Sequence, residues 1–92
     1  MQQKQAEIRA LSVLGWLAGN EELLPVFLSA TGASEADLRL RAEESEFLGS
    51  VLDFLMMDDA WVISYCDSQS LPYEILMQAR QALPGGQDVS WT

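Results

Sequence analysis

The stretch VLGWLAGNEELLPVFLSATG, residues 13–32, is echoed later in the chain by VLDFLMMDDAWVISYCDSQS, residues 51–70. A shift of 38 positions places aliphatic residues on identical ones and aromatic residues on other aromatic residues: Val13 on Val51, Leu14 on Leu52, Leu17 on Leu55, Trp16 on Phe54 and Phe27 on Tyr65. Because neither half could cover its own apolar face, the pattern predicts two related three-helix units that pack together about an approximate two-fold axis. Generic amphipathic patterning would give the same echo without a repeat, and this alternative stays open.

Apolar residues recur at three- and four-residue steps along almost the whole chain, which is the period of an α-helix. The one strand-like stretch is the short run WVISYC, residues 61–66. We therefore predict an all-α fold, a compact bundle of five to six short helices. The expected helices cover about residues 3–18, a segment ending near residue 31, residues 34–42, and three further segments that open at Glu44 or Ser45, at Asp58 and at Ser70, the last of them ending at Leu83.

The first of these helices carries a wide apolar stripe. We predict that it points Ile8, Leu11, Leu14, Leu17 and Ala18 inward, with Val13 and Trp16 widening the stripe. Such width is typical of a central helix that is covered on more than one side. The predicted inner faces of the later helices are Leu24, Phe27 and Leu28; Phe47, Leu48, Val51, Leu52, Phe54 and Leu55; Trp61, Val62 and Tyr65; and Ile75, Leu76, Ala79 and Leu83.

Several helix ends are marked by residues with a known capping role. Asn20 is a good N-cap for the second helix. Pro25 limits this helix because proline lacks a backbone N–H, so either the helix begins near Leu24 or its first turn is distorted. Gly32 is expected to end the second helix. Ser34, with Asp37 three residues later, predicts a capping box at the start of the third.

The length of 92 residues predicts one helical domain, residues 1–86, followed by a C-terminal tail, residues 87–92. No apolar run is long enough for a membrane span, and the polar start of the chain does not resemble a secretory signal. The single cysteine excludes a disulfide within the chain. We therefore expect a soluble cytoplasmic protein.

The acidic residues are unevenly distributed. The net charge is −9, and no Lys or Arg occurs between Ala42 and Ala79. This charge disfavours nucleic acid, whose phosphates need cations, and favours a protein partner that is itself basic. The candidate partner-binding residues are Glu43, Glu44, Glu46, Asp58, Asp59 and Trp91. An acidic surface that only keeps the protein soluble is the alternative reading.

Groups that perform catalysis are scarce in this sequence. There is no histidine, which removes the usual general base near neutral pH and the histidine-based zinc sites. Cys66 lies on an apolar helix face with no cation nearby in the sequence, so we expect a structural thiol. The acidic clusters match helix N-termini better than a calcium loop. We therefore expect no enzyme activity, no catalytic residue, no metal and no cofactor; a metal-dependent hydrolase that uses Glu43, Asp58 and Asp59 is the weakest alternative.

A second functional class comes from FLSATGASEADLRLRA, residues 27–42. Its spacing of alanine, glycine, serine cap, leucine and arginine resembles the turn of a helix-turn-helix DNA reader. Arg39 and Arg41 would help such a reader, whereas Glu35 and Asp37 would face the phosphates. A nucleic-acid-linked regulator, either a weak reader of this kind or an acidic DNA mimic, is therefore the alternative function.

Apolar side chains near the last helix provide another candidate surface. Tyr73 and Met77, with Met56 and Met57, are expected to form an adaptable exposed patch. Trp91 lies beyond a Pro-Gly-Gly break, where it can dock on its own domain or anchor a partner. The function expected first is a non-enzymatic protein–protein interaction module with an acidic face, and a homodimer is one form this interaction can take.

The segments LGWLAGNEELLPVFLSATGASEADLRLRA and FLGSVLDFLMMDD, together with the ending ALPGGQDVSWT, resemble a small bacterial family of uncharacterised proteins, domain of unknown function 3572. The likeness covers nearly the whole chain, and WLAGNEELL and the terminal LPGG and WT are its most distinctive parts. The resemblance implies a small cytoplasmic bacterial protein. It implies no activity, cofactor or functional residue.

Overall fold

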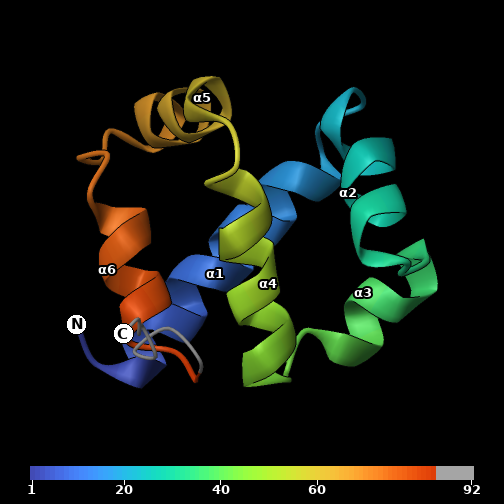
Figure 1. The fold of residues 1–92 in the computed structure, drawn as a ribbon, viewed down its shortest axis with the longest axis horizontal. Helices are drawn as coiled ribbons and strands as arrows, with labels where there is room; N and C mark the ends of the chain where they lie inside the picture. The colour runs from blue at the N-terminus through green and yellow to red at the C-terminus, as the bar shows by residue number, and fades with distance from the viewer. Residues whose placement is uncertain (85–92) are drawn as a thin grey trace, which may run out of the picture.

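The computed structural model describes residues 1–84, and in this range the chain forms six α-helices and no strand (Figure 1). The helices are α1 (Gln3–Ala18), α2 (Leu23–Thr31), α3 (Glu35–Arg41), α4 (Ser45–Leu55), α5 (Asp59–Gln69) and α6 (Ile75–Gln81). This confirms the predicted all-α bundle, and the ambiguous run at residues 61–66 is helical, inside α5. No helix within residues 1–84 has the length and apolar character needed to cross a membrane.

Two helices, α1 and α4, cross at the centre of the molecule and make its most extensive helix–helix contact (Figure 1). The helix α6 packs against both of them, and α2 packs across their other end. In Figure 1, α5 and α6 lie on one side of this central pair, and α2 and α3 lie on the other. The core is therefore built on the two apolar helices that the sequence echo singles out.

The predicted inner face of α4 is confirmed in full. All six of its predicted core residues are buried: Phe47, Leu48, Val51, Leu52, Phe54 and Leu55. Aromatic rings from neighbouring helices close over this face, since Phe27 meets Phe54 edge-on at a centroid distance of 5.2 Å and Trp61 stacks on Phe54 at 4.9 Å. Such pairs add to the stabilisation that comes from apolar area alone.

The predicted inner face of α1 is partly wrong. The buried residues of this helix are Ala6, Ala10, Val13, Leu14 and Leu17. The side chains of Ile8 and Leu11 are 61% and 43% exposed, and Ala18 is also exposed. Alanines at two buried positions let the neighbouring helices approach α1 closely, and this selects one side of the wide stripe as the core side. The opposite side remains uncovered by residues 1–84.

The other helices bury fewer residues than α4. The buried ones are Leu23 and Phe27 in α2, Leu38 in α3, Tyr65 and Cys66 in α5, and Leu76 and Ala79 in α6, joined by Leu83 after α6. Five predicted core residues are only partly buried, and they pack against this core: Leu24, Leu28, Trp61, Val62 and Ile75.

The predicted caps at Gly32 and Ser34 are confirmed, whereas the predicted N-cap Asn20 lies two residues before Glu22, which occupies the N-cap position of α2. The side-chain oxygen of Asn20 accepts hydrogen bonds from the backbone N–H groups of Glu22 and Leu23, both at 3.0 Å. Gly32 ends α2 in the left-handed conformation, with φ at 73°. Ser34 and Asp37 form the predicted capping box at the start of α3. Pro25 lies in the first turn of α2, as its missing N–H requires.

The start of the sixth helix differs from the prediction. Ser70 adopts a left-handed conformation, with φ at 56°, and ends α5 instead of opening α6. The chain then turns, and the backbone N–H of Ile75 donates to the carbonyl oxygen of Pro72 at 3.1 Å. α6 begins only at Ile75, so Pro72 lies in the preceding turn and not at the first helical position.

Some local features recur 38 positions apart. Asn20 and Asp58 each accept a hydrogen bond from the backbone N–H two residues later, at 3.0 and 2.8 Å. Gly32 and Ser70 both end a helix in the left-handed conformation. The packing is less regular, because α6 contacts both α1 and α4 whereas α3 makes no comparably extensive contact with either. The two-fold relation between the halves stays a prediction.

Candidate functional site

The two predicted acidic clusters lie at opposite ends of α4. Glu43, Glu44 and Glu46 surround its N-terminal end, whereas Asp58 and Asp59 follow its C-terminal end. α4 has 11 residues, so the two clusters are separated by roughly 16 Å along its axis. The structure therefore does not bring the five carboxylates together into a single site.

The cluster at the N-terminal end of α4 is exposed and partly engaged within the molecule. Glu44 pairs with Arg41, whose Nε lies 3.4 Å from the carboxylate oxygen Oε1. The same guanidinium lies over the ring of Phe47, 4.6 Å from its centroid. Glu43 and Glu46 are exposed to solvent, and Glu46 lies in the first turn of α4, where the helix dipole favours an acid.

The cluster at the other end of α4 has two different roles. Asp58 is the N-cap of α5, and its carboxylate accepts from the backbone N–H of Ala60 at 2.8 Å. Asp59 turns toward a groove between α5 and α6. Trp91, the remaining predicted partner-binding residue, lies outside the described residues.

The groove has a volume of about 300 Å³. Its lining is mainly apolar and comes from the end of α4, from α5 and from the start of α6: Met56, Asp59, Val62, Tyr73, Glu74 and Met77. Met77 is 59% exposed, and Tyr73 is 48% exposed. Carboxylates of Asp59 and Glu74 flank this apolar surface, so an apolar ligand group with a positive neighbour would fit its chemistry. We call these six residues the α5–α6 groove.

One wall of the α5–α6 groove is fixed by a hydrogen bond. The hydroxyl of Tyr73 donates to the carboxylate oxygen Oδ1 of Asp67 at 2.9 Å. This bond raises the pKa of Tyr73 above its ordinary value, and desolvation and the negative charge of Asp67 add to the effect. The tyrosine therefore keeps its proton and presents its ring to the groove at any physiological pH.

Sequence reasoning anticipated part of this groove. It grouped Tyr73 and Met77 with Met56 and Met57 as an exposed patch; the groove contains the first three, whereas Met57 is exposed but does not line it. It did not single out Glu74, and it assigned Val62 to the core. The missed signal is the turn at residues 71–74, which moves Tyr73 and Glu74 out of the sixth helix and toward α5.

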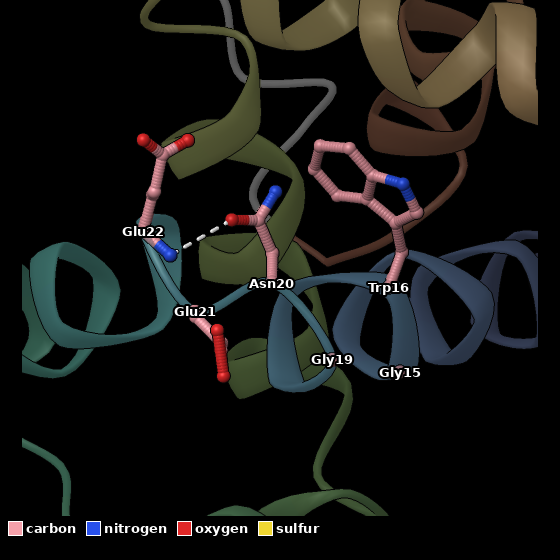
Figure 2. Close-up of a pocket in the computed structure, with 6 residues that line it drawn as sticks. All are labelled: Gly15, Trp16, Gly19, Asn20, Glu21 and Glu22. Atoms are coloured by element: carbon pink, nitrogen blue, oxygen red, sulfur yellow. Dashed lines mark hydrogen bonds between the residues drawn. The ribbon is translucent and has the colours of Figure 1, made fainter.

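A second hollow, of about 670 Å³ and widely open, lies where α1 ends (Figure 2). It is lined by Gly15, Trp16, Gly19, Asn20, Glu21 and Glu22. Figure 2 shows the indole of Trp16 standing on one side and the hydrogen bond from the Glu22 N–H to Asn20 on the other. Gly15 and Gly19 have no side chains, so the backbone at the end of α1 is exposed in this hollow. This hollow therefore offers a shallow surface of mixed polarity, with the indole of Trp16 as its apolar part and two carboxylates beside it.

The residues proposed for nucleic-acid reading lie on α3. Arg39 is exposed beside Leu40. Arg41 forms an ion pair with Glu44, and its guanidinium lies over the ring of Phe47. Glu35 and Asp37 occupy the first turn of the same helix. Of the two arginines, only Arg39 makes no ion pair among residues 1–84.

Groups with catalytic or metal-binding chemistry are dispersed in the described part of the chain. Cys66 is buried in the core, and this burial raises the pKa of its thiol. Within residues 1–84, no three Cys, Asp or Glu side chains are grouped so that they could hold a metal ion. Glu43 and Asp58 lie at opposite ends of α4, which separates them by more than the span of one ion's coordination shell.

Comparison with known proteins identifies the family of this chain. No curated protein and no solved structure matches it. The sequence profile described as "Protein of unknown function (DUF3572)" matches residues 3–86, which cover all six helices. The chain therefore belongs to the DUF3572 family.

Proposed function

We propose that this protein is a non-enzymatic interaction module and that its α5–α6 groove binds a partner protein. The partner segment carries a large apolar side chain next to a Lys or Arg. The observation that supports this proposal is the combination of an apolar floor, built from Met56, Val62 and Met77, with the flanking carboxylates of Asp59 and Glu74.

The chemistry of the lining favours a protein partner over a small polar ligand. Methionine side chains adapt their shape to different apolar groups, and a half-exposed tyrosine adds contact area at a low entropy cost. The net charge of −9 would attract a basic partner from a distance and increase its rate of association. A cytoplasmic location, the absence of catalysis and the absence of a cofactor belong to the same proposal.

A selection from random peptides tests the groove. Phage-displayed peptides are selected on the immobilised full chain, and the best binders are synthesised. We expect them to share a Leu, Phe or Trp beside a Lys or Arg, and to shift the methyl NMR signals of Met56 and Met77. Enrichment of acidic peptides, or shifts that leave both methionines unchanged, would count against the proposal.

Two matched substitutions localise the binding. Met77→Glu places a charge in the groove on an exposed helical position, so we expect affinity for the selected peptide to fall at least about tenfold. Leu40→Glu is the control, since Leu40 is 76% exposed on α3, on the other side of the molecule (Figure 1). Equal loss in both variants would mean that the groove is not the binding surface.

A further inference from the structure

The outward side of α1 is apolar although no residue of 1–84 covers it. Ile8, Leu11, Gly15 and Ala18 follow one another at steps of three and four residues, so they share one face of the helix. This face lies opposite the buried residues of α1, and Ile8 is its most prominent side chain, with 61% of it exposed. An apolar stripe of this length on the longest helix is typical of an interface.

The charges at the two ends of this outward face have opposite signs. Lys4 lies one turn before Ile8 on the same face and is exposed. Glu21 and Glu22 follow the other end of α1, and both are exposed at the rim of the hollow (Figure 2). A second helix with the same sequence would therefore be attracted if it ran antiparallel. In a parallel pair, Lys4 would face Lys4 and the acids would face each other.

The shape of the face selects the same orientation. Ile8 protrudes in the N-terminal half of α1, whereas Gly15 and Gly19 leave a hollow in the C-terminal half (Figure 2). A Cβ atom added at Gly15 would meet nothing within 4 Å, so the space directly above this residue is free. An antiparallel pair centred near Leu11 places each Ile8 over the Gly15 of the other copy. A parallel pair would set Ile8 against Ile8 and leave a gap at the glycines.

We propose that α1 is a self-association surface, on which two copies of the chain pair through antiparallel α1 helices. The contact is isologous, because Ile8 of each copy fills the hollow at Gly15 of the other and Lys4 of each copy lies near Glu21 and Glu22 of the other. One helix face per subunit gives a contact at the small end of specific interfaces. The dimer is therefore expected to form and dissociate with concentration. This proposal does not depend on the α5–α6 groove.

Sedimentation equilibrium of the full chain over a wide range of concentrations tests the proposal. We expect the weight-average mass to rise from the 10.2 kDa of one chain toward twice that value as concentration increases. Ile8→Glu should keep the protein monomeric over the same range. Gly15→Leu should weaken association at least about tenfold, because its side chain would occupy the space that Ile8 of the other copy fills, whereas a Cβ atom at this position meets no other atom of its own subunit within 4 Å. Circular dichroism of each variant checks that the helices are intact.

Charge reversal and two controls complete the test. Lys4→Glu should weaken association, and combining it with Glu21→Lys and Glu22→Lys should restore it. Leu40→Glu removes an exposed apolar residue from α3 and should leave association unchanged. A chain that stays monomeric at all concentrations, or a dimer that is indifferent to Ile8→Glu, would overturn the proposal. The proposal would also be overturned if the full chain stayed monomeric and a chain without residues 85–92 dimerised, because the tail would then be what covers α1.

Discussion

At the scale of single residues, Tyr65 carries the most informative contacts. Its side chain is fully buried where α5 meets α1, and its ring meets Trp16 edge-on at 5.7 Å. Its hydroxyl lies 2.7 Å from the hydroxyl of Ser12, and Arg9 donates to it at 3.3 Å. Both partners come from α1, more than fifty positions earlier in the chain. Helical periodicity predicts that Tyr65 is buried, but it gives no indication of these partners.

Removing the Tyr65 hydroxyl is expected to destabilise the protein. In Tyr65→Phe the ring still fills its site, but Ser12 and Arg9 lose a shared hydrogen-bond partner, so the free energy of unfolding should fall by about 1 kcal/mol. Urea denaturation measures this change. Tyr73→Phe is the matched control, because Tyr73 is half exposed and bonds to Asp67 at the surface. A loss in the control as large as that in Tyr65→Phe would contradict the assignment.

Glu7 connects the pH dependence of stability to one contact between α1 and α4. Ser45 donates to the carboxylate of Glu7 at 2.7 Å, and this bond, followed by one from Gln3, lowers the pKa of Glu7. Because the folded pKa lies below the unfolded one, the contribution of Glu7 to stability is present above the unfolded pKa. It is lost as the pH falls through the folded pKa.

An NMR titration of the Glu7 side-chain carboxyl carbon checks this contact. We expect its midpoint below that of an ordinary glutamate, and Ser45→Ala should move it upward because the strongest hydrogen bond to the carboxylate is gone. Glu46→Gln, one position after Ser45 in the sequence, is the control and should leave the midpoint near its original value. A midpoint that Ser45→Ala does not move would show that the bond is absent in solution.

At the scale of the helices, two side-chain caps are expected to stabilise their elements equally. Asn20 accepts from the backbone N–H of Leu23, the first residue of α2, and Asp58 accepts from that of Ala60 in α5, so alanine at either position should cost about 1 kcal/mol. Urea denaturation of Asn20→Ala and Asp58→Ala measures both values. Glu43→Ala, at an exposed turn, is the control and should change stability by less than about 0.5 kcal/mol. If the control cost as much as the caps, surface charge and not capping would explain the loss.

The helices were predictable where local chemistry decides the structure. Gly32, Ser34 and Asp37 mark their helix ends through bonds within a few residues, so the sequence alone contains the information. The inner face of α4 was predictable because only one of its sides is apolar. In α1 both sides are apolar, and the buried one includes Ala6 and Ala10. Periodicity weights Ile8 and Leu11 above alanine, so it placed these two residues on the core side by mistake, although it placed Leu14 and Leu17 correctly.

The candidate site depends on tertiary placement, and the sequence predicted it less well. Tyr73 and Met77 could be grouped because both lie outside the predicted inner face of the last helix. The predicted helix bounds already set the two acidic clusters at opposite ends of α4, but the partners of their carboxylates, such as Arg41 for Glu44, could not be predicted. The predicted start of α6 was wrong because Ser70 adopts a left-handed conformation, which glycine favours and serine does not, so the residue type gave no sign that α5 ends there. The role of Glu74 in the groove follows from that turn.

At the scale of the whole molecule, the negative charge is poorly neutralised. Two ion pairs occur among residues 1–84: Arg41 with Glu44, and Arg80 with Asp53 at 2.7 Å. Arg80 also donates to the carbonyl oxygen of Pro84 at 3.1 Å, so its guanidinium links α4, through Asp53, to the residues that follow α6. Most of the 14 acidic side chains therefore repel one another across a molecule only 34 Å long.

This repulsion predicts that salt stabilises the fold. Raising the ionic strength from about 0.01 to 0.2 M shortens the screening length from roughly 30 Å to under 10 Å, which is less than the molecular dimensions. We expect the free energy of unfolding to rise by about 1 kcal/mol, seen as an increase of about 4–8 °C in the midpoint of thermal unfolding. Replacing Glu43, Glu46 and Glu74 with glutamine should make the midpoint of thermal unfolding depend less on salt. Each substitution removes the charge of an exposed carboxylate that belongs to neither ion pair. A midpoint that falls with salt would mean that the two ion pairs, and not the unpaired carboxylates, dominate the electrostatics of this domain.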